Sequence, residues 1–216
     1  NGTFTISDGA TLTTTNSALS VTASDVDMNT TGAIDVGSGA LTFLTASSST
    51  VGLGAGAGTF SLNDTELDNI TVSGLLTIGD SNTTALTVDG WSANTTVSGN
   101  VTLTANDATD GAITFSGTAS SVRAGLTLNA ADGITLSTGL TTSVATTGTT
   151  ITIDADSDNN AESTATFVIT DAGSLNTSTD DLTITAADVN LNDSGTITAT
   201  GGTVTLLAST AVDLGL

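Results

Sequence analysis

The amino-acid sequence predicts an all-β fold, namely a parallel β-helix (β-solenoid) with about 20 residues per coil. Three observations support this prediction. Short segments in which apolar residues alternate with Thr or Ser recur along the whole chain, and the sequence repeats itself at a long and a short interval. In addition, no segment shows the period of an amphipathic helix.

The strand pattern occurs in nine segments. In each of them every second residue is apolar, which is the period of a strand with one buried face. Gly, Asn, Asp and Ser, which tolerate tight turns, separate the segments. The predicted strands are FTIS at 4–7, LSVTA at 19–23, LTFLTA at 41–46, LLTIG at 75–79, VTLTA at 101–105, LTLNA at 126–130, TITIDA at 150–155, LTITA at 182–186 and TVTLLA at 203–208.

The long repeat covers both ends of the chain. LSVTASDVDMNTTGAIDV at 19–36 returns as LTITAADVNLNDSGTITA at 182–199, a shift of 163 residues (182 − 19). Weaker copies that begin near Phe60 and Phe115 divide this shift into units of about 54 residues. We therefore expect one continuous β-solenoid over 1–216, built from degenerate copies at 1–56, 57–111, 112–163 and 164–216.

The short repeat gives the length of a coil. The segment at 182 aligns with the one at 204, and the segment at 19 aligns with the one at 41, each 22 residues further on (204 − 182 and 41 − 19). Three short strands and three turns need about that much chain, at about 3.3 Å per strand residue. Antiparallel β-sandwich domains would show the same alternation and are the alternative fold, but they have no reason to repeat their sequence.

Stacked coils place equivalent side chains over one another, so the repeat also predicts the core. Four of the five phenylalanines hold the same position in the repeat and are expected to form one internal column. A second apolar column is expected from four leucines. The two sets are Phe4, Phe60, Phe115 and Phe167, and Leu19, Leu76, Leu126 and Leu182.

Composition narrows the partners. The 216 residues carry a formal charge of −21, and Arg123 is the only basic side chain. Nucleic acid and anionic membranes would repel such a chain, whereas divalent cations are natural partners. No apolar run of about 20 residues is present, so we expect no membrane insertion. Without Cys, neither disulfides nor thiolate metal sites can form.

The same composition argues against an enzyme. Histidine and lysine are absent, so no general base of suitable pKa is available to activate a serine or threonine hydroxyl. The neighbouring carboxylates Asp180 and Asp181 are interpreted as a solvated turn instead of an acid/base pair. Trp91, in VDGWSANTT, is the single tryptophan; it is either a packing residue or a platform for a sugar ring.

One segment carries a recognisable ligand pattern. DADSDNNAE at 154–162 places oxygen-bearing side chains at alternate positions, an arrangement that can surround a hard cation such as Ca²⁺. It differs from an EF-hand loop because Asn159 and Ala165 replace the expected Gly and Glu. The alternative is a solvated acidic turn. The candidate ligands are Asp154, Asp156, Asp158, Asn160 and Glu162; no other cofactor is expected.

Two further features concern the surface. Threonine rows such as TITI at 150–153 resemble those of ice-binding solenoids, but the copies look uneven and do not predict a constant outward pair. Sequons N-x-S/T would fit an exported surface protein. In addition to Asn1, the glycosylation candidates are Asn29, Asn63, Asn69, Asn82, Asn94, Asn100, Asn176 and Asn192.

The strand and turn texture of LTITAADVNLNDSGTITATGGTVTLLAS, at 182–209, resembles the degenerate coils of large bacterial surface β-helices, the filamentous haemagglutinin and autotransporter-adhesin type. That resemblance implies a right-handed, secreted parallel β-helix that serves as an adhesin shaft, surface-layer component or extracellular fibre. Because both ends of the chain have strand sequences, we expect it to continue, or to stack copies end to end, into filaments. The alternatives are a glycan- or receptor-binding adhesin repeat and an ice-binding solenoid.

Overall fold

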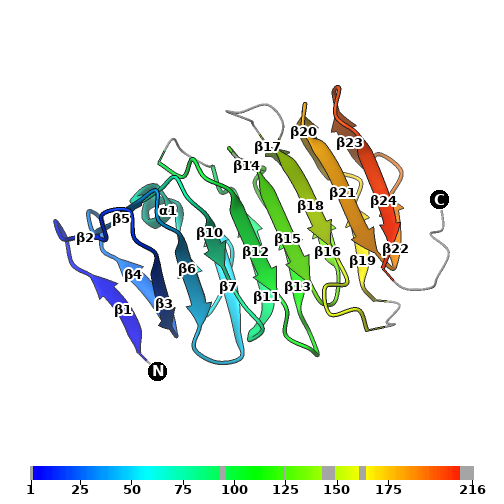
Figure 1. The fold of residues 1–216 in the computed structure, drawn as a ribbon. Helices are drawn as coiled ribbons and strands as arrows, with labels where there is room; N and C mark the ends of the chain where they lie inside the picture. Colours follow the sequence, from blue (N-terminus) through cyan, green and yellow to red (C-terminus); the bar gives the residue numbers. More distant parts are fainter. Residues whose placement is uncertain (1, 93–95, 124, 143–148, 161–163, 210–216) are drawn as a thin grey trace.

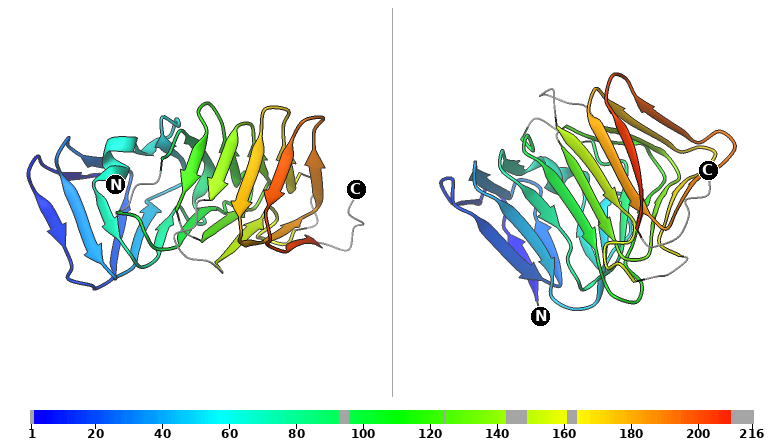
Figure 2. Two further views of the ribbon diagram at one scale, coloured as in Figure 1. Left: turned by 90° about the horizontal axis from the view of Figure 1, so that it is seen from above. Right: turned by 45° about the vertical axis from the view of Figure 1, so that its right-hand side comes forward.

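The structure, a computed structural model, describes residues 2–92, 96–123, 125–142, 149–160 and 164–209. Within them the chain is all-β, and every strand pair is parallel. The strands lie side by side in an elongated array that runs from the N-terminal to the C-terminal end (Figures 1 and 2). The all-β prediction with long parallel sheets is confirmed, and the antiparallel alternative is wrong for these residues.

The longest sheet has eight strands and contains most of the strands predicted from sequence. Its order follows the chain without reversal, because each new strand is added beside the previous one. From the N-terminal end it consists of β3 (Leu19–Ala23), β6 (Leu41–Thr45), β10 (Leu76–Ile78), β12 (Val101–Ala105), β15 (Leu126–Ala130), β18 (Thr150–Asp154), β21 (Asp181–Ala186) and β24 (Val204–Ala208).

A seven-stranded sheet and three smaller ones complete the array. The seven strands are β8 (Phe60–Leu62), β7 (Ser49–Gly54), β11 (Thr83–Asp89), β13 (Ala112–Phe115), β16 (Ile134–Leu136), β19 (Thr166–Ile169) and β22 (Asp188–Leu191). The smaller sheets are β14 (Ser120–Val122), β17 (Gly139–Thr142), β20 (Ser174–Ser178) and β23 (Thr196–Ala199); β2 (Thr11–Thr13), β5 (Ala33–Gly37) and β9 (Ile70–Val72); and β1 (Thr3–Ile6) with β4 (Asp25–Met28).

From β12 to β24 the chain visits three sheets in strict rotation: the eight-stranded, the seven-stranded and the four-stranded sheet, then the eight-stranded sheet again. Each of them presents alternate apolar residues to a shared interior. At the N-terminal end the rings of Phe43 in β6 and Phe60 in β8 lie 6.2 Å apart at 60°, so the two long sheets face each other across the core.

Pairing registers confirm the 22-residue step. Leu19 lies beside Leu41, and Leu182 beside Val204. The predicted leucine column is also confirmed: Leu19, Leu76, Leu126 and Leu182 occupy one line, with other aliphatic residues between them. The step is not constant, however, because the coil from Leu41 to Leu76 takes 35 residues (76 − 41).

The phenylalanine column is only partly correct. Phe60 and Phe167 share a line in the seven-stranded sheet. Phe115 lies in the neighbouring line, beside Val88, and Phe4 pairs with Val26 in the two-stranded sheet. Three of the four are fully buried, whereas Phe4 is half-buried at the end of the array. The division into four copies of 54 residues therefore stays a prediction.

The 163-residue repeat extends to the secondary structure. Adding 163 to the bounds of β4, β5 and β6 gives the first residues of β22, β23 and β24, and the same shift carries β1 onto β19. The six strands at one end of the array thus have the same spacing as the six at the other end.

A line of glycines lets successive coils approach at the corner before the eight-stranded sheet. A Cβ added to Gly74 would lie 2.5 Å from the carbonyl oxygen of Gly39, and one added to Gly202 would lie 2.0 Å from that of Asp180. Such distances are far below van der Waals contact, so the backbone spacing at this corner requires glycine.

The sequence gave no sign of a helix in the period of its apolar residues, but the structure contains a short one, α1 (Asp64–Asp68). Its N-cap is Asn63, whose side chain accepts from the N–H of Glu66, while the Glu66 carboxylate accepts from the N–H of Asn63. This is a capping box, and the spacing N-x-x-E at 63–66 is the sequence signal that could have revealed it.

Candidate functional site

The predicted cation ligands lie in the loop that follows β18, at the corner between the two long sheets. Asp154 is the last residue of β18 and is half-buried, Asp156 is fully buried, and Asp158 and Asn160 are half-buried. Glu162 lies outside the described residues. The interpretation as a solvated turn is therefore wrong for Asp156, although it holds for the exposed Asn159.

Asp156 is the unusual member of this loop. Its side chain is 0% exposed, and neither carboxylate oxygen has a hydrogen-bond partner. The Oδ1 atom of Asn160 is likewise buried and unpartnered. Burial raises the pKa of Asp154, and the nearby charge of Asp156 adds to the rise, so the two carboxylates lie close enough to interact.

Neighbouring coils hold the loop in place. The N–H of Ser157 donates to the carbonyl of Ala130 at 2.9 Å, and its hydroxyl bonds Oδ1 of Asn106 at 2.6 Å. The Asp158 carboxylate accepts from the side-chain amide of Asn160 at 2.7 Å. Among the described residues, no three acidic, His or Cys side chains converge as a metal cluster. Any cation here must therefore use two carboxylates together with amide or backbone oxygens.

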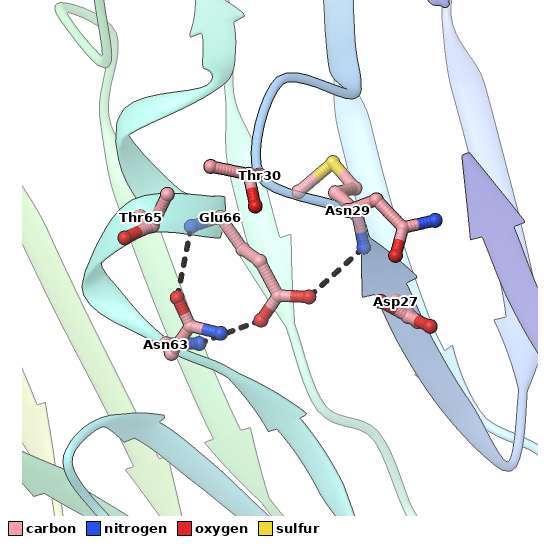
Figure 3. A pocket seen from close by; sticks show the side chains of 7 residues that line it. Asp27, Asn29, Thr30, Asn63, Thr65 and Glu66 are labelled. Atoms are coloured by element: carbon pink, nitrogen blue, oxygen red, sulfur yellow. Dashed lines mark hydrogen bonds between the residues drawn. The ribbon is translucent and has the colours of Figure 1, made fainter. Parts of the chain in front are cut away.

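A second polar site is a hollow of about 310 Å³ between β4 and α1, shown in Figure 3. Its buried carboxylate, Glu66, accepts from the N–H of Met28 and the N–H of Asn63, both at 2.9 Å. Burial raises the pKa of Glu66, and these two donors oppose the rise. Since both oxygens are engaged by backbone, Glu66 anchors α1 to β4. The hollow is lined by Asp27, Met28, Asn29, Thr30, Asn63, Thr65 and Glu66.

The sequons differ in how their amide groups are used. Asn69 donates its side-chain N–H to the carbonyl of Thr30, and Asn82 donates to Asp80. An attached glycan would disturb these bonds. Asn100 and Asn176 are exposed and their amide nitrogens have no such bond in the described structure. Asn29 and Asn63 are also exposed, Asn192 is half-buried, and Asn94 lies outside the described residues together with Asn1.

The other candidates for chemistry are buried. Trp91 is 2% exposed and belongs to the hydrophobic core, so its ring offers no platform for a sugar. Asp180 is 0% exposed with both oxygens unpartnered, which makes the interpretation as a solvated turn wrong for this residue. Its neighbour Asp181 is exposed and accepts from the N–H of Thr203 at 2.7 Å.

One outward column of the eight-stranded sheet is uniform, contrary to the uneven appearance of the sequence. A hydroxyl residue occupies this position in every strand, and none of these hydroxyls bonds another part of the described protein. The next outward column is not uniform, since it includes Leu44 and Asp154. The uniform column is Ser20, Thr42, Thr77, Thr102, Thr127, Thr152, Thr183 and Thr205.

The two ends of the array expose strand edges and apolar side chains. At the C-terminal end β22, β23 and β24 each pair on one side only among the described residues, and Val204 is 44% exposed. At the N-terminal end β1, β2 and β3 do the same, and Leu12 and Leu19 are only half-buried.

Comparison with known proteins adds no family to these observations. No protein-family model, no curated protein and no solved structure matches the chain. Among the described residues, no helix has the length and apolar character needed to cross a membrane.

Proposed function

We propose that this chain is a structural segment of an extracellular β-solenoid rod, of the kind that forms an adhesin shaft, a surface-layer component or a fibre. The observation that carries the proposal is the strict rotation of the chain through three parallel sheets around one apolar interior. Such a path winds the backbone into coils, and we expect them to be closed and right-handed, as parallel crossovers almost always are. An experimental density map would test both features.

The second support is the uniform interior. Aliphatic and aromatic columns run from coil to coil with little interruption, and a rod of this kind gains its stability from contacts between neighbouring coils. Together with the long backbone ladders, this gives stiffness but no deep cleft. The exterior is acidic and hydroxyl-rich, and a single Arg without Lys leaves one cleavage site for trypsin-like proteases. These properties suit a secreted scaffold.

The third support is that the two end faces match. If the β1–β3 face of one copy were placed on the β22–β24 face of another, Phe4 would follow Val189, Leu12 would follow Ile197, and Val21 would follow Leu206. Every apolar column would then continue in parallel register. We therefore propose that copies join end to end by strand addition, with unpaired edges supplying the hydrogen bonds.

Electron microscopy of the purified chain tests this assembly. Because each copy carries a charge of −21, filaments should form and lengthen as salt screens the repulsion. Leu206→Lys places a charge in an inward column at the edge and should shorten or abolish the filaments. Leu207→Lys, on the outward side of the same strand, should leave them unchanged. Monomers at every salt concentration, or equal filaments from both variants, would refute end-to-end assembly.

The uniform hydroxyl column favours a second candidate, ice binding. Its hydroxyls repeat at about 4.8 Å along a row of parallel strands and are free to bond water. Thermal hysteresis of the wild type, lost in Thr127→Lys and kept in Thr114→Lys on the outward face of β13, would support this role. Absence of hysteresis in the wild type would exclude it.

The glycan-binding alternative has lost its candidate residue, because Trp91 is buried. No other observation in the described structure favours it.

A further inference from the structure

We propose that the loop after β18 binds a hard divalent cation, with Ca²⁺ as the best fit, through Asp156, Asp154 and Asn160. This inference does not depend on the rod or on its assembly. It begins with the Asp156 side chain, which is 0% exposed and has no hydrogen bond to either oxygen. A buried carboxylate in this situation needs a counter-charge, because removing it from water without compensation is costly.

The chain itself cannot provide that charge. It contains no Lys and no His, and its single basic residue, Arg123, follows β14 in a different corner of the array. The surrounding net charge of −21 makes the corner still more attractive to cations. The counter-ion for Asp156 must therefore come from solution.

The other oxygens of the loop suit a hard cation. The carboxylate of Asp154 lies within interaction range of Asp156, and Oδ1 of Asn160 is buried without a partner. Asp158 holds the amide nitrogen of Asn160, so the amide oxygen is the atom left available. Carboxylate and amide oxygens in an irregular loop are the ligands of Ca²⁺, which accepts flexible geometry; Mg²⁺ demands a stricter octahedron.

The loop is already in position before any ion binds. Bonds from Ser157 to Ala130 and Asn106 attach it to the two preceding coils. A bound ion would thus join the loop to a rigid support, and binding would be coupled to the stability of these coils. With few protein ligands the site should be weak, with a dissociation constant of about 10⁻⁴–10⁻³ M, as in extracellular modules.

Calorimetric titration of the chelator-treated chain with CaCl₂, together with thermal unfolding, tests the site. Wild type should bind one Ca²⁺ and unfold at a higher temperature with it, while NaCl at equal ionic strength should not reproduce the shift. Asp156→Asn should weaken binding by about tenfold or more. It should also unfold no earlier than the wild type without metal, because the unpaired charge is gone.

The matched control is Asp193→Asn, which removes the same charge from an exposed turn and should bind like the wild type. Asn160→Ala should weaken Ca²⁺ binding as well, and provides a second measurement if Asp156→Asn does not fold. A wild type that shows no Ca²⁺ response, or Asp156 and Asn160 variants that bind as tightly as the control, would overturn the proposal.

Discussion

Replacing Asp180 with Ala should stabilise the protein, although it removes a side chain from the interior. Asp180 is 0% exposed, and neither carboxylate oxygen has a partner. An unsatisfied buried polar group costs about 1–3 kcal/mol, and more if it is charged. Loss of the carboxylate leaves a small void that costs about 1 kcal/mol. In register, the neighbours of Asp180 are Thr149 and Gly202, so a small residue fits this corner. The expected net gain is about 1–2 kcal/mol.

Urea denaturation at pH 7 measures this gain as a higher midpoint with an unchanged slope. Asp181→Ala is the control because it removes the same charge one residue away. Asp181 is exposed and accepts from the N–H of Thr203, so its loss should destabilise by about 0.5–1.5 kcal/mol. Opposite signs for the two neighbours would attribute the effect to burial. An Asp180→Ala midpoint below that of the wild type would refute the reasoning.

Three further predictions concern packing and charge. Gly74→Ala should destabilise by about 1–3 kcal/mol because its Cβ meets carbonyl oxygens of the preceding coil, whereas Gly2→Ala, with open space around it, should be neutral in the same urea assay. Phe167→Ala should cost about 3–5 kcal/mol, and Phe4→Ala clearly less since that ring is half-buried; equal losses would contradict the assigned burial. Burial raises the pKa of Glu66 above its ordinary 4.5, so the folded chain holds this proton more tightly than the unfolded chain. Stability should therefore fall as pH rises from 4.5 through the raised pKa, and Glu66→Gln should remove that part of the pH profile measured by thermal unfolding.

The parallel strand architecture could be predicted because two signals agreed. Alternation of apolar and hydroxyl residues identified the strands, and the 22-residue step from Leu19 to Leu41 identified which of them pair. The leucine column followed, since identical strand sequences place identical residues side by side. In such a fold, sequence similarity and spatial neighbourhood have the same origin.

The phenylalanine column failed where coil length varies. Between Leu41 and Leu76 the chain inserts β7, β8 and α1 into one coil, so the interval from Phe60 to Phe115 no longer corresponds to a whole number of equal coils. A shift of two residues keeps a side chain facing inward but moves it to the next line. Both positions remain apolar, and the sequence pattern cannot distinguish them.

The candidate cation loop was found by its composition, but the sequence could not rank its members. Asp156 and Asp158 have the same chemistry and the same spacing, yet one is fully buried without a partner and the other is held by Asn160. That difference arises from how the loop folds back onto neighbouring coils, which is a tertiary property. The same holds for Asp180, buried beside the exposed Asp181.

The equal spacing of the six strands at each end has a genetic consequence. Exchange between the two DNA stretches that encode them would add or delete 163 residues in one event and leave every side chain facing its former direction. In the eight-stranded sheet this block spans the six steps from β3 to β21, about 29 Å of length at about 4.8 Å per step. Size could then change in whole blocks during evolution, without a new folding problem to solve at either junction.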